Sequence, residues 1–163
     1  MKPATGNRAV YGRLVLLTIL LATIAAAGPL PYDESADAKA AVQQALTVAR
    51  TRGLPVLLIF GANWCEDCRA LDRALKAGRG AELVGGAFEL VKVDVGNFDR
   101  NLDLAKAYGN PISKGIPAAV LLSADNRVLY ATRAGELANA RRMSDSGIYD
   151  FLSRVTREAA ARL

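Results

Sequence analysis

The chain contains two cysteines, three positions apart in the stretch Trp64-Cys65-Glu66-Asp67-Cys68. Two thiols at this spacing could supply half of a metal site, could form a stabilising crosslink, or could alternate between dithiol and disulfide. Each use requires different residues around the pair. The composition of the chain and the elements that carry the cysteines therefore decide between the three.

The metal and crosslink interpretations are weak. Structural zinc takes four ligands from Cys, His or carboxylate side chains, and none of the 163 residues is a histidine. Glu66 and Asp67, or a second chain, would have to complete such a site. A disulfide stabilises more when it closes a longer loop, and a bond between Cys65 and Cys68 closes a very short one. We therefore expect neither a metal nor an organic cofactor at the pair.

Thiol-disulfide exchange fits the pair better, because the sequence places it where a strand turns into a helix. Residues 56–60 form a continuous apolar run that is typical of a strand buried on both faces. After the pair, apolar residues recur at helical spacing on the face that carries Cys68. Unpaired amides at a helix start lower a thiol pKa from about 8.5. Cys65 is then the attacking thiolate, and Cys68 is the thiol that resolves the mixed disulfide.

The remaining elements complete an alternating order of helices and strands. Further apolar patterns predict helices over 35–52, about 102–108 and after 147, and strands over 88–95, 119–122 and 128–131. We interpret the glycine-rich residues 78–86 as a connection. Strands separated by helices pair in parallel, whereas the last two strands form a hairpin. The predicted fold class is α/β with a mixed sheet.

The N-terminus predicts export. Basic residues precede an uncharged apolar run over 14–27, which ends in three alanines, and this order is typical of a secretory signal peptide. We predict a signal peptide over 1–27 with cleavage near Ala27, a linker over 28–36 and one domain over 37–163. An uncleaved leader that anchors the chain in the inner membrane is the alternative. In a Gram-negative cell, export would place the domain in the periplasm.

The charge pattern argues against nucleic-acid binding. Removal of the leader takes away three basic residues and no acidic ones, so the net charge falls from +5 to +2. No cluster of Lys and Arg with interleaved aromatic residues remains, as a nucleic-acid surface would require. A mature chain of this size fits one domain with a single core. We expect a monomer.

Four stretches in order resemble the thioredoxin superfamily: "VLLIFGANWCEDC", "LVKVDV", "KGIPA" and "ATRAGEL". The resemblance covers the chain from about residue 38 to its end. It implies a thioredoxin fold, with a central mixed sheet of about four strands, flanking helices and an N-terminal helix. It also implies a cis peptide bond between Ile116 and Pro117, with Pro117 against Cys65. Ile116, Pro117 and Trp64 are the expected contacts of a protein substrate.

The chain departs from the thioredoxin pattern near the cysteines. Familiar members carry a buried aspartate six positions before the first cysteine, and Ile59 stands there. Deprotonation of Cys68 is then left to water, Asp67 or a carboxylate that the sequence does not place. We interpret Lys92 as a lysine whose charge reaches the surface. We interpret residues 133–147 as a solvated loop rather than a lip beside the site.

The direction of electron flow depends on small electrostatic contributions to the stability of the Cys65 thiolate. Glu66 and Asp67 either disfavour the Cys65 thiolate or complement the helix dipole. Together with the export signal, the departures resemble exported disulfide interchange and isomerase proteins. We favour the reductase or isomerase direction because the acidic pair makes the dithiol a better reductant and because nothing in the sequence resembles a dedicated oxidant. The expected partners are protein thiols and disulfides, and an envelope or membrane thiol-disulfide protein that donates electrons. The rival function is a redox-inert binding module that uses the cis-proline face.

Overall fold

A central sheet of four strands organises the chain, whose computed structural model describes residues 28–161. The strand order is β2-β1-β3-β4. Strand β1 pairs in parallel with β2 and antiparallel with β3, and β3 pairs antiparallel with β4. The bounds are Val56–Gly61 for β1, Glu89–Asp94 for β2, Ala118–Leu122 for β3 and Val128–Ala131 for β4. The predicted α/β class with a four-stranded mixed sheet is confirmed.

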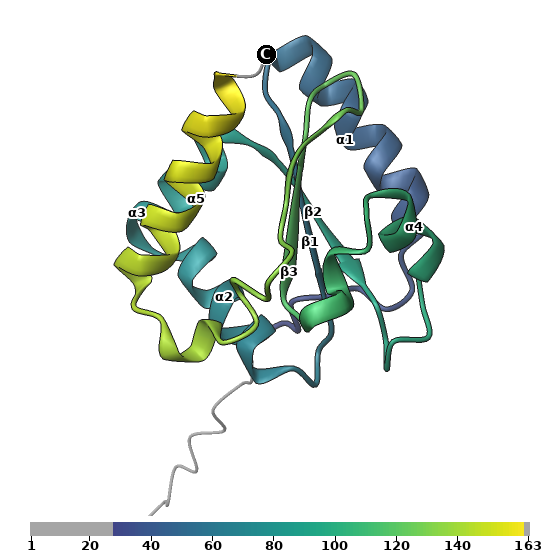
Figure 1. Cartoon of the computed structure of the whole chain (residues 1–163), viewed down its shortest axis with the longest axis vertical. Coiled ribbons are helices and arrows are strands. Elements are labelled where there is room, and N and C mark those ends of the chain that lie inside the picture. The colour runs from purple at the N-terminus through teal and green to yellow at the C-terminus, as the bar shows by residue number, and fades with distance from the viewer. Residues whose placement is uncertain (1–27, 162–163) are drawn as a thin grey trace, which may run out of the picture.

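Helices cover both faces of the sheet (Figure 1). One face carries α1 (Ala38–Arg52) and α4 (Leu102–Ala107). The opposite face carries α2 (Glu66–Lys76), α3 (Gly78–Ala87) and α5 (Asp145–Ala160). Two short 3-10 turns, η1 (Pro111–Lys114) and η2 (Ala140–Arg142), lie in the connections. Within the described residues, no helix is both long and apolar enough to cross a membrane.

Strand β1 lies between β2 and β3, and all of its residues are buried. Val56, Leu58 and Phe60 join the core beneath α1, whereas Leu57 and Ile59 join the core beneath α2 and α5. A strand covered on both faces needs a continuous apolar run rather than an alternating one. The burial of β1 therefore fixes the end of the strand at Gly61, and residues 62–65 connect it to the start of α2 at Glu66.

The glycine-rich residues 78–86 form helix α3, and our interpretation of them as a connection was wrong. Leu83 and Val84 pack against the core beneath α5, and this tertiary contact outweighs the low helix propensity of four glycines. A Cβ on Gly80 would overlap the carbonyl oxygen of Ala74. Glycine is therefore required where α3 approaches the end of α2.

Part of the segment predicted as a linker packs firmly onto the domain. Tyr32 is 4% exposed and belongs to the core. Its backbone N–H donates to Asn63 Oδ1 at 2.9 Å, and Asn63 Nδ2 donates to the Tyr32 carbonyl at 2.9 Å. These two hydrogen bonds attach the N-terminal segment to the loop before the cysteines. The predicted leader lies outside the described residues.

Candidate active site

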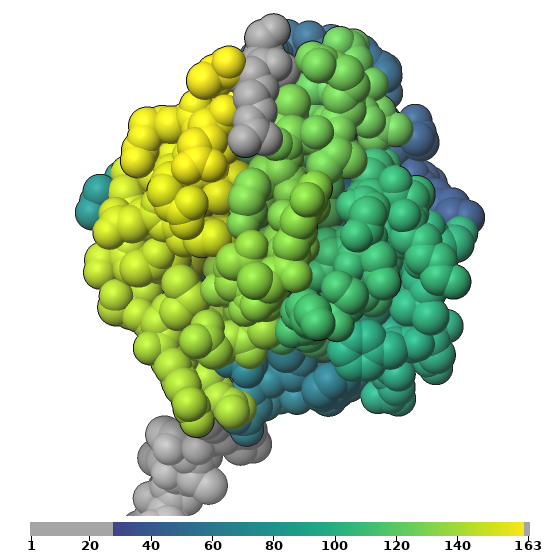
Figure 2. Space-filling model, viewed as in Figure 1, coloured from purple at the N-terminus to yellow at the C-terminus, as the bar shows by residue number. Residues whose placement is uncertain are grey.

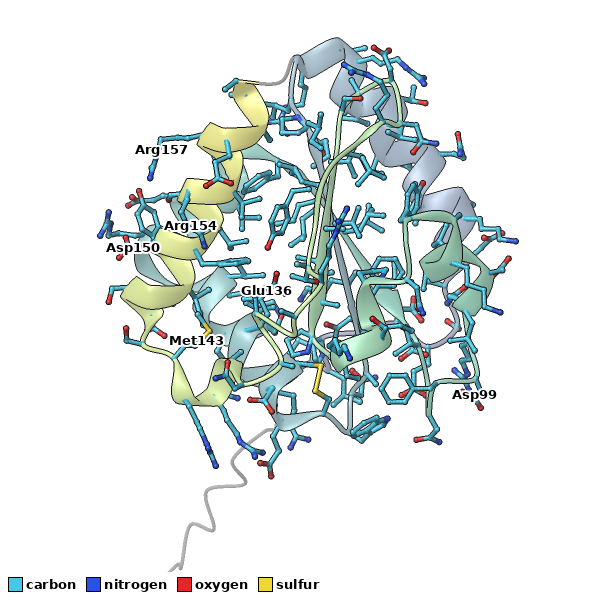
Figure 3. All side chains as sticks on the ribbon, viewed as in Figure 1. Asp99, Glu136, Met143, Asp150, Arg154 and Arg157 are labelled. Atoms are coloured by element: carbon cyan, nitrogen blue, oxygen red, sulfur yellow. A yellow bond between two sulfur atoms is a disulfide. The ribbon has the colours of Figure 1, made fainter. Side chains whose placement is uncertain are left out.

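Cys65 and Cys68 form a disulfide at the start of α2 (Figure 3). Cys65 is the N-cap residue of the helix, and its Sγ accepts a hydrogen bond from the Cys68 backbone N–H at 3.1 Å. Cys65 is 6% exposed and Cys68 is 1% exposed. An N-cap sulfur lies where the unpaired amides and the helix dipole favour a negative charge. Cys65 is therefore the more exposed of the two residues and the one at which a thiolate is best stabilised.

Pro117 follows a cis peptide bond, and the segment that contains it faces the disulfide. The carbonyl oxygen of Ile116 lies 3.6 Å from Cys65 Sγ. This contact joins two parts of the chain separated by 51 positions, because β3 begins beside the end of β1. The structure thus brings together Cys65, Cys68, Ile116 and Pro117.

Trp64 lies beside the disulfide with 54% of its surface exposed. Its Nε1–H donates to the carbonyl oxygen of Gly96 at 2.9 Å, which holds the ring in place. The ring centroid of Phe98 lies 6.3 Å away, and Phe98 is 42% exposed. Trp64, which adjoins Cys65, and Phe98 beside it thus form an exposed apolar surface in the described part of the chain.

Residues 133–147 form a lip beside the cysteines, so the interpretation of this segment as a solvated loop was wrong. Leu137 and Ala140 are buried and anchor it. The backbone N–H of Arg141 donates to Asp67 Oδ1 at 3.0 Å, and its guanidinium donates to Glu66 Oε2 at 2.8 Å. Figure 2 shows the yellow-green residues of this segment against the blue-teal start of α2. Both carboxylates between the cysteines are thereby paired with the lip.

Ile59 is buried, and the nearby carboxylate comes from a different element. Lys92 lies opposite Ile59 in the β1–β2 register, and its ammonium pairs with the carboxylate of Asp72 on α2. Lys76 Nζ lies 2.8 Å from the same carboxylate. The Lys92 side chain is 18% exposed, so it forms a largely buried ion pair instead of reaching the surface as we predicted. The sequence signal for Asp72 was its position one helical turn after Cys68.

Tyr32 is a site residue that sequence reasoning missed. Its hydroxyl lies over Gly61, on the side where the Cys68 sulfur also lies. Apolar periodicity carries no information about this contact, because Tyr32 stands outside any helix or strand. The only local signal was the conspicuous aromatic residue between Pro31 and the polar residues that follow.

Comparison with known proteins agrees with this geometry. The thioredoxin-like family model matches residues 37–124. A disulphide isomerase from Xylella fastidiosa Temecula1 is 56% identical, with a TM-score of 0.78 over 80% of this chain and 99% of that chain. The oxidised C-terminal domain of DsbD from Neisseria meningitidis is 21% identical, with a TM-score of 0.50 over 72% of this chain and 96% of that one.

A thioredoxin from Thermus thermophilus is similar at 19% identity, with a TM-score of 0.50 over 71% of this chain and 81% of that chain. At these low identities, the DsbD domain and this thioredoxin show the shared fold alone. Comparison with curated protein sequences gave no match. The family model and the isomerase both cover the cysteine pair. The chain therefore belongs to the thioredoxin-like family, and its cysteine pair is that of a thiol-disulfide oxidoreductase.

Proposed function

We propose that this protein exchanges disulfides with protein substrates in the reductase or isomerase direction. The single observation that carries the proposal is the position of Cys65 Sγ, at the N-cap of α2 and 3.6 Å from the carbonyl before the cis proline. An N-cap thiolate is an effective nucleophile, and the Ile116 backbone beside it offers a place for an extended substrate chain. The 56% identical relative named a disulphide isomerase supports the same direction.

The reaction proceeds in two exchanges. The Cys65 thiolate attacks a sulfur of the substrate disulfide, a mixed disulfide forms, and the other substrate sulfur leaves as a thiolate. Cys68 then loses its proton and attacks Cys65 Sγ, which releases the reduced substrate and forms the Cys65–Cys68 disulfide. A second thiol protein in the cell envelope returns the pair to the dithiol. In the isomerase direction, the substrate thiolate freed by the first exchange attacks a different disulfide of the same protein, and the thiolate that this attack displaces breaks the mixed disulfide and releases Cys65 as a thiolate.

The aromatic surface of Trp64 and Phe98 supports a protein substrate rather than a small thiol. Exposed aromatic side chains beside a reactive centre are typical of protein contact surfaces. The apolar leader supports export, and the related disulphide isomerase fits an oxidising compartment in which protein disulfides form. We propose the periplasm, and a soluble domain after cleavage near Ala27.

Trapping tests the exchange. In a Cys68→Ser protein the mixed disulfide cannot be resolved, so covalent complexes with substrates should accumulate on a non-reducing gel. The Cys65→Ser, Cys68→Ser double variant is the matched control and should give none. If both proteins give the same pattern, the domain is the redox-inert binding module instead. Equilibration with glutathione buffers then measures the potential, and a value near that of strong oxidants would reverse the proposed direction.

A further inference from the structure

Two polar side chains converge on Gly61, at the point where β1 ends, and a third stands on the neighbouring strand. The phenol oxygen of Tyr32 and the Sγ of Cys68 both lie less than 3.0 Å from the position that a Cβ on Gly61 would occupy. The hydroxyl and the sulfur are therefore less than twice that distance apart. One water molecule, or a small rotation of the phenol, connects two polar atoms across such a gap. The absence of a side chain at Gly61 makes this approach possible.

Asp94 is the third group, and it stands opposite Gly61 in the β1–β2 register. Its Oδ2 accepts the Gly96 N–H at 3.2 Å and lies 3.5 Å from Arg100 Nη1. Its Oδ1 is buried and has no hydrogen-bond partner among the described residues. A buried carboxylate oxygen without a donor is costly, so a free lone pair at this place is a structural exception.

The charges around Asp94 keep it a usable base. Burial has the largest effect on the pKa of the Asp94 carboxyl and raises it. The charges of Glu34 and Asp99 raise it further, whereas the Gly96 N–H and the charge of Arg100 lower it. Figure 3 shows Asp99 at the outer edge of the molecule. Burial and the charge of Asp94 also raise the pKa of Tyr32, so the phenol keeps its proton and can both donate and accept one. A base works best when its pKa approaches the operating pH.

The other carboxylates near the cysteines are already engaged. Asp67 accepts the Arg141 backbone N–H, and Glu66 pairs with the guanidinium of the same residue. Asp72 holds the ammonium groups of Lys92 and Lys76. Asp94 is the one carboxylate with a buried and unpartnered oxygen in the described part of the chain.

We propose that the Asp94 carboxylate, acting through the Tyr32 hydroxyl, removes the proton of the Cys68 thiol when Cys68 resolves a mixed disulfide at Cys65. The thiol proton passes to the phenol oxygen as the phenol proton passes to Asp94 Oδ1. The Cys68 sulfur then bonds to Cys65 Sγ, the bond from Cys65 to the partner sulfur breaks, and the partner leaves as a thiolate. The relay rests on the proposed exchange chemistry and supplies the base that Ile59 does not.

The test uses the chromogenic disulfide DTNB, so it needs no protein substrate. Reduced full-length protein is mixed with less than one equivalent of DTNB. The first release of coloured thiolate reports attack by Cys65, and the second reports resolution by Cys68. Near pH 7, Tyr32→Phe and Asp94→Asn should each slow the second release at least about tenfold and leave the first unchanged. The double variant should be no slower than the slower single variant, because the two groups act in one relay.

The pH profile separates a proton relay from a structural role. Above the ordinary thiol pKa of about 8.5, Cys68 ionises without a base, so the variants and the parent protein should converge. Tyr108→Phe is the matched control, because the Tyr108 hydroxyl bonds Asn126 near the β3–β4 turn and should leave both phases unchanged. Equal second-phase rates near pH 7, or slowing that persists at high pH, would overturn the relay. Failure to trap protein substrates would instead refute the proposed function and leave this result intact.

Discussion

Replacement of Arg141 by alanine should make the Cys65–Cys68 disulfide harder to reduce. The guanidinium lies 2.8 Å from Glu66 Oε2, and its Nε lies 3.9 Å from Asp67 Oδ1. Without it, two uncompensated carboxylates stand within one helical turn of Cys65, where they disfavour the thiolate. The reduced form loses stability relative to the disulfide, so the redox potential should fall.

The magnitude follows from Coulomb's law. One unit charge about one helical turn away, at ~6 Å, contributes about 0.7 kcal/mol at the dielectric constant of water. The Arg141 side chain is 49% exposed, so the value for water is the appropriate one. Because about 1.4 kcal/mol corresponds to 30 mV for a two-electron couple, the potential should fall by about 15 mV.

Equilibration with glutathione buffers of graded ratio measures this shift. Arg142→Ala is the matched control, because Arg142 stands in the same 3-10 turn and its side chain forms no ion pair in the described part of the chain. At about 1 M salt the Debye length shrinks to about 3 Å, so the shift should disappear. An unchanged potential at low salt, or a shift that survives high salt, refutes an electrostatic role for Arg141.

Three further predictions concern stability, measured by urea unfolding. Asp72→Leu should cost about 3 kcal/mol, because it leaves the Lys92 ammonium without a partner. Lys92→Met should cost less, because Lys76 still pairs with Asp72, and the double variant should cost less than Asp72→Leu. Gly61→Ala should cost about 1–3 kcal/mol because its methyl overlaps the phenol and the resolving sulfur, whereas Gly85→Ala, with open space around it, should stabilise. Burial raises the pKa of Asp94, so the stability that its protonated form contributes below about pH 4 is lost as the pH rises through the raised pKa. Asp94→Asn should therefore gain stability relative to the parent protein as the pH rises above the ordinary aspartate pKa of about 3.9.

Local patterns in the sequence predicted the fold but only part of the site. The continuous apolar run of β1 and the helical spacing after Cys68 predicted where the disulfide lies, because burial on both faces leaves a direct mark on residue type. No local pattern predicted the ion pairs of Asp72 with Lys92 and of Arg141 with Glu66. These contacts join residues that are distant in sequence. The type of a charged residue does not tell whether its side chain faces water or an oppositely charged side chain.

In helix α3, tertiary packing outweighs the local sequence pattern. Four glycines lower the intrinsic helix propensity of residues 78–86, and the helix forms because Leu83 and Val84 gain burial beneath α5. Where propensity and tertiary burial disagree, the sequence alone shows only the first. The same limitation hid Tyr32, which is held by two backbone hydrogen bonds to the Asn63 side chain and follows no periodic pattern.

The anchoring of Tyr32 affects where this domain can be cut. The family match begins at residue 37, so a truncation drawn at that boundary would keep every strand and helix that the structure describes and would discard the phenol. The vacancy over Gly61 would then admit solvent to the Cys68 sulfur. Such a fragment would retain the circular dichroism of the intact domain while its second thiol titrated like one in water. Recombinant versions intended for redox measurements should therefore start no later than residue 28.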